Sequence, residues 1–161
     1  MARNLDNYDI RILEVLSREG RISWTELAER IALSQTPTLR RVRALEADGL
    51  ITGFRAVVDE TRLGLGLSVF ISVSLERQTD EALASFEQAV TELPSVMDCF
   101  MMTGEADYLL RVILPDVAAY RRFVSILTTL EGVARVSSSF AVKSVVQRAT
   151  PLLSEIVTEQ D

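Results

Sequence analysis

The strongest constraint on the fold is a change in the spacing of apolar residues close to Gly49. Before this glycine, apolar residues recur every three or four positions, as they do on one face of an α-helix. After it, stretches that alternate apolar and small polar residues are separated by stretches of helical spacing. A chain of 161 residues has room for one large domain or two small ones. The change in spacing favours two, a helical domain followed by an α+β domain.

The first fifty residues predict three short helices. Asp6 and Ser23 are suited to cap the first two, because their side-chain oxygens can accept hydrogen bonds from free backbone N–H groups. Ser34 is the corresponding candidate for the third helix, and Gly20 and Gly49 end the first and the third. Because about four residues join the second helix to the third, the arrangement is that of a helix-turn-helix.

The third helix has the pattern of a helix that enters the major groove of DNA. Leu39, Val42 and Leu45 define its buried side, while arginines lie opposite and on both flanks. Arginine suits this use because its planar guanidinium can form two parallel hydrogen bonds to a guanine edge or a phosphate. The candidate DNA-binding residues are Ser34, Gln35, Thr36, Pro37, Thr38, Arg40, Arg41 and Arg43. The competing interpretation is an ordinary solvated helix face that happens to carry arginines.

The residues after Gly49 predict the element order β-α-β-β-α-β of a ferredoxin-like sandwich. The expected strands cover residues 68–75, 96–103, 108–114 and 133–146, the expected helices 79–92 and 116–131, and residues 50–58 predict one more strand before them. The resulting divisions are a helix-turn-helix domain at 1–50, a linker strand at 51–63, a ferredoxin-like domain at 64–148 and a C-terminal tail at 149–161. Two helices cover only one face of such a sheet, so we expect a second copy to cover the other in a homodimer.

Two groups of residues in the second domain are candidates for binding a small molecule. In the turn after residue 102, Gly104 lets the backbone approach a ligand, and Glu105 or Asp107 can accept an ammonium group. In the last strand, three successive serines offer hydroxyl groups, of which alternation sends the outer two to one face and the middle one to the other. The candidate effector-binding residues are Thr103, Gly104, Glu105, Asp107, Tyr108, Ser137, Ser138 and Ser139. A plain hairpin turn and a polar edge strand are the competing interpretations.

The composition excludes several kinds of catalytic and metal site. The chain has no histidine, which removes histidine zinc sites, Ser-His-Asp triads and Cys-His pairs. We therefore expect no enzyme activity, no catalytic residue, no metal and no cofactor. The longest uncharged run, residues 63–75, is shorter than the about 20 apolar residues of a membrane span, so we expect no membrane partner. The single cysteine and the lack of a secretory signal predict a cytoplasmic protein, and Cys99, beside Met101 and Met102, predicts a buried strand.

The net charge of −6 means that the protein as a whole does not attract DNA. Residues 1–50 carry eight arginines and eight acidic side chains, so the acidic excess lies after residue 50. Salt screens charges that are more than roughly 8 Å apart under physiological conditions. A local arginine patch in the first domain can therefore bind DNA apart from the distant acidic surface.

Three stretches together resemble the Lrp/AsnC family, the feast/famine regulators of bacteria and archaea. Residues 5–13, Leu-Asp-x-x-Asp-x-x-Ile-Leu, with Gly-Arg-Ile-Ser at 20–23, look like the opening helix of the family. Residues 27–51, Leu-Ala-x-x-Ile-x-Leu-Ser-x-Thr-Pro-x-x-x-Arg-Val-x-x-Leu-Glu-x-x-Gly-x-Ile, resemble its DNA-reading unit. Residues 104–110, Gly-Glu-Ala-Asp-Tyr-Leu-Leu, are similar to the Gly-Asp-x-Asp-Tyr signature of its effector domain.

The resemblance implies a function that the spacing alone does not show. The chain would be a sequence-specific DNA-binding transcriptional regulator whose oligomeric state or DNA binding responds to a small effector, an amino acid. Its partners would be double-stranded DNA, the amino acid and further copies of itself, as homodimers that assemble into tetramers or octamers. The helix-turn-helix at 1–50 would be of the winged type, and the ferredoxin-like domain at 64–148 would bind the effector and form the oligomer. The strand at 51–58 would pair across the dimer, and the effector would bind between effector domains, near residues 103–108 and 137–140. A ligand-independent architectural protein that organises DNA is the alternative.

Three residues depart from the family pattern. Gln35 stands where many members have proline, and Thr38 stands where many have cysteine, so we expect a base preference of its own. Glu105 replaces the usual aspartate and adds a methylene where an ammonium group would be read. The identity of the effector therefore does not follow from the family.

Overall fold

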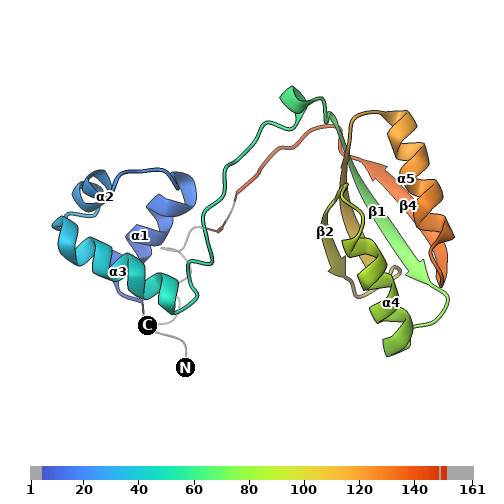
Figure 1. The fold of residues 1–161 in the computed structure, drawn as a ribbon, viewed down its shortest axis with the longest axis horizontal. Helices are drawn as coiled ribbons and strands as arrows, with labels where there is room; N and C mark the ends of the chain where they lie inside the picture. Colours follow the sequence, from blue (N-terminus) through green and yellow to red (C-terminus); the bar gives the residue numbers. More distant parts are fainter. Residues whose placement is uncertain (1–4, 149, 152–161) are drawn as a thin grey trace. The chain divides into compact units, whose positions relative to one another are not determined.

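The computed structural model describes residues 5–148 and 150–151 and divides the chain into two compact units. The first unit is Met1–Val57 with Val146–Asp161, and the second is Val58–Val145. In the described part of the first unit the regular elements are helices, whereas the second unit packs helices on a sheet (Figure 1). The expected α+β fold class, with a helix-turn-helix followed by a ferredoxin-like domain, is confirmed.

The three predicted helices of the first unit are present. They are α1, Asn7–Arg18; α2, Trp24–Arg30; and α3, Gln35–Ala47. Asp6 caps α1, because its Oδ1 accepts two hydrogen bonds of 2.9 Å from N–H groups of the first turn. Ser23 caps α2 through a 3.2 Å hydrogen bond from a backbone N–H. Ser34 occupies the N-cap position of α3, but its side chain accepts no capping hydrogen bond.

A short turn joins α2 to α3 over a shared apolar core. The buried apolar side chains of this core come from α1 as well as from α2, α3 and the turn between them, and are Ile12, Leu16, Leu27, Ile31, Val42 and Leu45. The turn closes with a 2.9 Å hydrogen bond from the Leu33 N–H to the Ala28 carbonyl. Within it, Ala32 has a φ of 59°, in the left-handed region that residues with a side chain rarely adopt. The turn therefore holds α2 and α3 in their relative orientation at the cost of local backbone strain.

The second unit is a four-stranded antiparallel sheet with two longer helices and one short 3-10 turn. In chain order its elements are η1, Thr61–Leu63; β1, Leu67–Leu75; α4, Asp80–Thr91; β2, Val96–Met101; β3, Tyr108–Leu114; α5, Val117–Thr129; and β4, Val133–Phe140. The strands lie in the order β2-β3-β1-β4, so β1 and β3 are central and β2 and β4 are edges. The predicted β-α-β-β-α-β order is confirmed.

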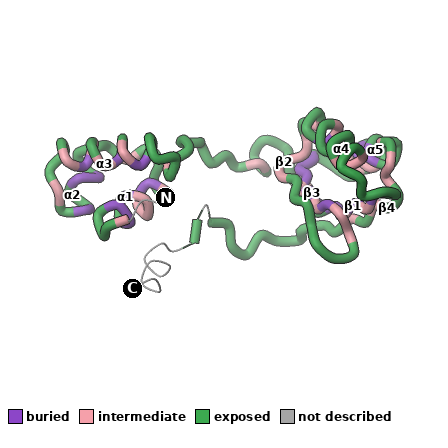
Figure 2. The backbone as a smooth tube through the Cα atoms, turned by 90° about the horizontal axis from the view of Figure 1, so that it is seen from below, coloured by how far each residue is buried: buried purple, intermediate pink, exposed green. Residues whose placement is uncertain are grey.

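Both longer helices cover the same face of the sheet. Alternate side chains of β1 and β3, such as Ile71 and Leu110, pack against Phe86 of α4 and Leu127 of α5 in one buried core. Figure 2 shows this burial concentrated between the helices and the strands. The side chains that alternate with them, including Phe70, point to the opposite face, which carries no helix among the described residues.

Two predicted strand segments have no strand structure. Residues 52–59 are exposed and irregular, and β4 ends at Phe140 rather than at residue 146. A strand forms only where a neighbouring backbone supplies hydrogen bonds. Among the residues that the structure describes, none pairs with residues 52–59 or 142–146 in a sheet. The apolar composition of these segments is therefore not sufficient to form a strand within one chain.

Candidate functional site

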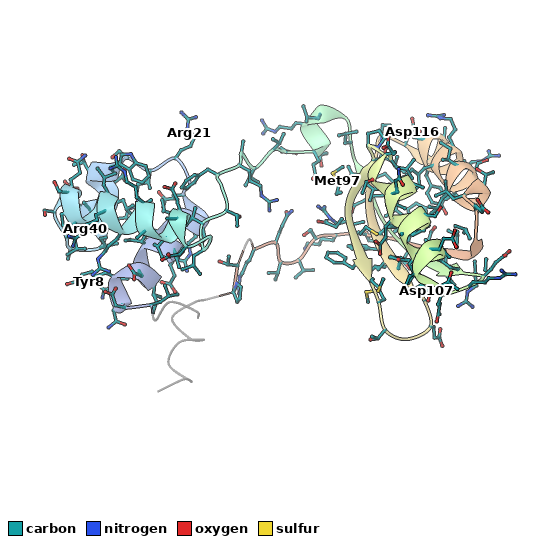
Figure 3. All side chains as sticks on the ribbon, turned by 60° about the horizontal axis from the view of Figure 1, so that its bottom comes forward. Tyr8, Arg21, Arg40, Met97, Asp107 and Asp116 are labelled. Carbon is teal, nitrogen blue, oxygen red and sulfur yellow. The ribbon has the colours of Figure 1, made fainter. Side chains whose placement is uncertain are left out.

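The outward side of α3 carries exposed polar side chains. Val42 and Leu45 are buried and Leu39 is half-buried, as their spacing predicts. Arg40 and Arg43 are exposed, and neither forms an ion pair with any residue in the described part of the chain. Figure 3 labels Arg40. The other accessible candidates on this helix are Ser34, Gln35, Thr36 and, half-buried, Pro37.

Thr38 does not belong to this exposed group, and its assignment as a DNA-binding residue is wrong. The residue is completely buried, and its hydroxyl donates a 2.9 Å hydrogen bond to the Ser34 carbonyl. The physical reason is helical spacing, because Thr38 precedes Val42 by four positions and Leu45 by seven and so lies on their side. A fully buried side chain cannot reach a base or a phosphate.

Arg41 points toward α1. Its Nη1 lies 2.7 Å from Asp6 Oδ2 and 2.8 Å from Asp9 Oδ1, and its guanidinium carbon lies 5.3 Å from the centre of the Tyr8 ring. The hydrogen bond to Asp9 is the main reason why the pKa of Arg41 is raised. Burial raises the pKa of Asp6, but hydrogen bonds from the Asp9 N–H and from Arg41 outweigh it and lower that pKa overall. Sequence reasoning identified Asp6 only as a cap and did not connect Asp9 with Arg41.

The turn between β2 and β3 is held by Asp107. Its Oδ2 accepts a 2.7 Å hydrogen bond from the Leu75 N–H, and its Oδ1 accepts a 2.6 Å hydrogen bond from Gln78 Nε2 (Figure 3 labels Asp107). Both carboxylate oxygens are thus engaged within the chain. Gly104 has a φ of 121°, a backbone conformation that is strained for residues with a side chain, although the space around an added Cβ atom is open. Thr103 is exposed at the start of this turn.

Glu105, in contrast, presents a free side chain at the tip of the turn. The interactions recorded for it involve only its backbone carbonyl, which accepts long hydrogen bonds from Ser74 Oγ at 3.3 Å and from Arg135 Nη2 at 3.4 Å. The side chain is exposed and has no ion-pair partner among the described residues. Of the two carboxylates predicted to accept an ammonium group, Glu105 is therefore the accessible one.

Tyr108 lies on the side of the sheet that the helices cover. It is 1% exposed, its ring centre is 4.7 Å from that of Phe86, and its hydroxyl donates a 2.8 Å hydrogen bond to Glu87 Oε1. Burial, followed by the hydrogen bond to Glu87, holds the pKa of Tyr108 well above its usual value. The hydroxyl therefore stays protonated at neutral pH.

The structure separates the three candidate serines between the two faces of the sheet. Ser138 pairs with Ile71 and is half-buried toward the helices, whereas Ser137 and Ser139 are exposed on the opposite face. The three serines therefore do not all face one site in a single chain.

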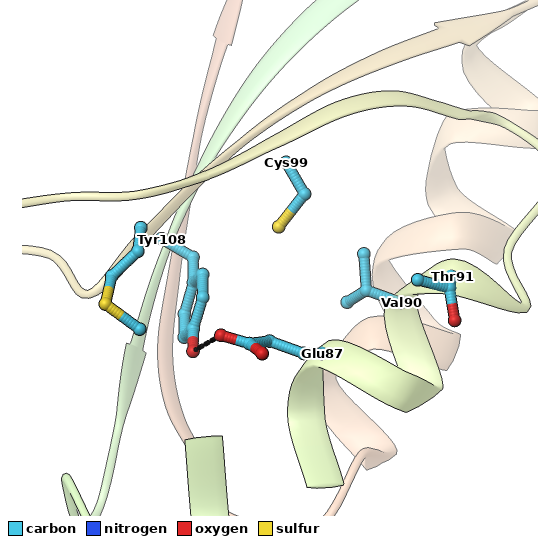
Figure 4. Close-up of a pocket in the computed structure, with 6 residues that line it drawn as sticks. Glu87, Val90, Thr91, Cys99 and Tyr108 are labelled. Atoms are coloured by element: carbon cyan, nitrogen blue, oxygen red, sulfur yellow. Dashed lines mark hydrogen bonds between the residues drawn. The ribbon is translucent and has the colours of Figure 1, made fainter. Parts of the chain in front are cut away.

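A pocket of about 210 Å³ lies between α4 and the β2 edge (Figure 4). Its lining residues are Glu87, Val90, Thr91, Cys99, Met101 and Tyr108. Cys99 and Met101 are exposed rather than buried as expected, because β2 is an edge strand. Partial desolvation, followed by the nearby negative charge of Glu87, raises the pKa of the Cys99 thiol. No sequence pattern marks Glu87 and Thr91 as pocket residues, because polar residues at their positions are typical of a solvent-exposed helix face.

Neither a metal centre nor a membrane span is found in the described residues. Within residues 5–148 and 150–151, no three acidic or cysteine side chains come together as metal ligands. No helix described there has the length and apolar character needed to cross a bilayer.

The chain matches two families and several characterised regulators. Residues 5–52 match the winged helix-turn-helix DNA-binding family, and residues 68–151 match the Lrp/AsnC ligand-binding domain. The Bkd operon transcriptional regulator of Pseudomonas aeruginosa is 52% identical over 92% of this chain and 98% of its own length. The leucine-responsive regulatory protein of Escherichia coli is 39% identical over 82% of this chain and 81% of its own length.

A solved structure of a transcriptional regulator has the same fold as this chain. A transcriptional regulator from Neisseria meningitidis in complex with L-Met superposes with a TM-score of 0.91 at 38% identity, covering 95% of this chain and 99% of that one. The ligand-binding match spans more than half of the chain, and the helix-turn-helix match spans the unit that carries α3. The chain therefore belongs to the Lrp/AsnC family and is a DNA-binding transcriptional regulator with a ligand-binding domain, not an enzyme.

Proposed function

We propose that α3 is the helix that reads DNA, with Arg40 and Arg43 as its base or phosphate contacts. The observation that carries this proposal is that both guanidinium groups are exposed and unpaired among the described residues, on the side opposite the buried Val42 and Leu45. Ser34 joins them, because its hydroxyl is not used to cap the helix. Gln35 and Thr36 at the helix start, beside the half-buried Pro37, complete the surface.

Fluorescence anisotropy tests this assignment. Repeated selection of a random duplex pool by the full-length protein supplies the DNA site for the measurement. Arg40→Ala is expected to cost about 1–3 kcal/mol on this site and to relax base preference at one position. Arg77→Ala is the matched control, because Arg77 is an exposed arginine of the second unit. Affinity of Arg40→Ala equal to wild type would refute the assignment.

We infer that the effector is an amino acid and that its ammonium group is accepted by Glu105. The accessible carboxylate of Glu105, beside the fully engaged carboxylate of Asp107, supports this choice. The Neisseria relative bound to L-Met supports the ligand class. We place Thr103 and Gly104 around the ligand as the rest of the turn, and we propose that Tyr108, which is buried against Phe86, supports the turn from the covered side of the sheet. Ser137 and Ser139 lie on the helix-free face of the sheet, which a second copy would cover, so we propose that they approach the turn of that copy.

The effector proposal is tested by repeating the DNA titration with each of the twenty amino acids. Glu105→Gln should raise the concentration needed for half of the response, whereas Glu76→Gln, which removes an exposed carboxylate elsewhere on the same unit, should not. Gly104→Arg should abolish the response and spare DNA binding. DNA binding that no amino acid changes would contradict the proposal and favour the ligand-independent architectural alternative.

We further propose that the protein acts as a homodimer that assembles into tetramers or octamers. Phe70 is 37% exposed and Phe100 is 53% exposed on the sheet face without helices, and a second copy would bury both. The irregular segment 52–59 would gain a strand partner in the same assembly. Analytical ultracentrifugation should find a dimer or larger species, and Phe70→Asp should dissociate it. Since its proposed target is DNA, we place the protein in the cytoplasm, with domains at 1–50 and 64–148 joined by the linker at 51–63.

A further inference from the structure

The reading helix is joined to α1 by one concentrated polar contact. Arg41 lies between the exposed Arg40 and Arg43 in the sequence, yet its own side chain is only 24% exposed. Its Nη1 lies within 2.8 Å of two carboxylates, those of Asp6 and Asp9. All of its side-chain partners described above come from the start of α1, including the ring of Tyr8 on which the guanidinium lies.

The burial of Asp9 makes this contact difficult to exchange. Asp9 is 2% exposed, and a buried carboxylate is stable only when it is paired and hydrogen-bonded. If Arg41 turned outward to a DNA phosphate, it would withdraw its positive charge from Asp9. A surface phosphate contact does not compensate for a carboxylate left buried beside fewer partners. Arg41 therefore stays on α1 when the protein binds DNA.

Helical geometry transmits this constraint to the neighbouring arginines. Arg40 and Arg43 are three positions apart and share one side of α3, while Arg41 points away from them. Fixing the direction of Arg41 against α1 fixes the rotation of α3 about its own axis. That rotation determines whether Arg40 and Arg43 face the groove.

We propose that Arg41 is a positioning residue rather than a DNA contact, and that Asp6 and Asp9, although acidic, are required for sequence-specific DNA binding. The proposal rests on the assignment of α3 as the reading helix. It gives a prediction of unusual sign. Simple electrostatics says that removing a negative charge from a DNA-binding domain tightens binding. Removing the charge of Asp6 or Asp9 should instead weaken specific binding, because α3 loses its fixed rotation.

Asp6→Asn is the central variant. Asparagine caps helices as well as aspartate does, so this change keeps the cap of α1 and replaces the charged acceptor that faces Arg41 with a neutral amide. Glu29→Gln is the matched control, because Glu29 is exposed in the same unit and forms no ion pair with a described residue. Asp9→Asn and Arg41→Met complete the set, with Arg41→Lys as a conservative variant that can still pair with one carboxylate.

Each full-length variant is titrated by anisotropy against the selected duplex and a scrambled duplex at several salt concentrations, after circular dichroism has shown that it is folded. Asp6→Asn and Arg41→Met should lose about five- to tenfold in affinity for the selected duplex, the lower part of the loss that a base contact causes. Their affinity for the scrambled duplex should stay within about twofold, since phosphate contacts are kept. The salt slope of Arg41→Met should equal that of wild type, and Arg41→Lys should recover part of the lost affinity.

Three results would overturn the inference. If Asp6→Asn binds the selected duplex as tightly as Glu29→Gln does, the carboxylates do not position the helix. If Arg41→Met lowers the salt slope by about one, Arg41 contacts a phosphate directly. If Arg40→Ala binds as wild type does, the assignment of α3 fails, and the inference fails with it for a separately identifiable reason. If Asp9→Asn does not fold, Asp6→Asn still tests the inference, because its helix cap is preserved.

Discussion

Replacing Asp107 with alanine should destabilise the ligand-binding unit and leave the helical unit unchanged. The wild-type carboxylate accepts hydrogen bonds from the Leu75 N–H at 2.7 Å and from Gln78 at 2.6 Å. The sheet register shifts between Ser74 and Leu75, so no regular ladder bond replaces the first of these. A partly buried hydrogen bond to a charged group, such as the one from the Leu75 N–H, contributes about 1.5–3 kcal/mol to the free energy of unfolding. The hydrogen bond from the exposed Gln78 contributes less. The sum is about 3 kcal/mol.

Urea denaturation can measure this loss one unit at a time. The only tryptophan, Trp24, lies in α2, so its fluorescence reports the helical unit, whereas the β-sheet signal in circular dichroism reports the other. With a denaturant slope of about 1–1.5 kcal/mol per molar for a unit of this size, Asp107→Ala should lower the midpoint of the sheet transition by about 2–3 M. The Trp24 transition should not move. A sheet midpoint within about 0.3 M of wild type, or an equal shift of both transitions, would refute this reasoning about Asp107.

Three further predictions concern the helical unit. Ala32→Gly should stabilise it by about 0.5–1 kcal/mol in the Trp24 urea transition, because glycine adopts a φ of 59° without strain; a lower midpoint would contradict this. The pKa of Asp6 is lowered in the folded state, so its carboxylate stabilises the fold above its unfolded pKa of about 3.9. This stabilisation is lost as the pH falls through the folded pKa. Below pH 4 the urea midpoint of the wild type should therefore drop more steeply than that of Asp6→Asn. Thr38→Val should keep DNA affinity within about twofold of wild type while costing about 1 kcal/mol of stability, and a loss of DNA affinity as large as that of Arg40→Ala would return Thr38 to the interface.

The elements that the sequence predicts best are those whose causes are local. Asp6 and Ser23 cap their helices as expected, since a cap depends on residues only a few positions away. The same holds for β3, whose short apolar run after the turn predicts its bounds of Tyr108–Leu114. Thr38 was also predictable, because its distance of four and seven positions from Val42 and Leu45 already places it on the buried side.

The features that could not be predicted depend on partners that are distant in the chain. Arg41 meets Asp9 across 32 positions, so no local pattern distinguishes it from Arg40 as a DNA contact. Cys99 has the apolar surroundings of a central strand, but strand order makes β2 an edge. The segment 52–59 has strand-forming residues and no neighbouring backbone among those described. The composition of a segment shows which secondary structure it can form, and its neighbours in the fold determine whether it forms that structure and whether it is buried.

The strand order also determines when each half of the protein can fold during its synthesis. The helical core is complete once Leu45 has been made, whereas β1 must wait for β4, with Val69 facing Phe140. At about 5–20 residues per second, the ribosome needs roughly 4–14 s to synthesise the chain from Val69 to Phe140. During that interval β1 keeps Ile71 and Val73 without their final cover, and the serines that alternate with them limit its tendency to aggregate. The helical core can therefore form in the nascent chain before the sheet of the second unit is complete.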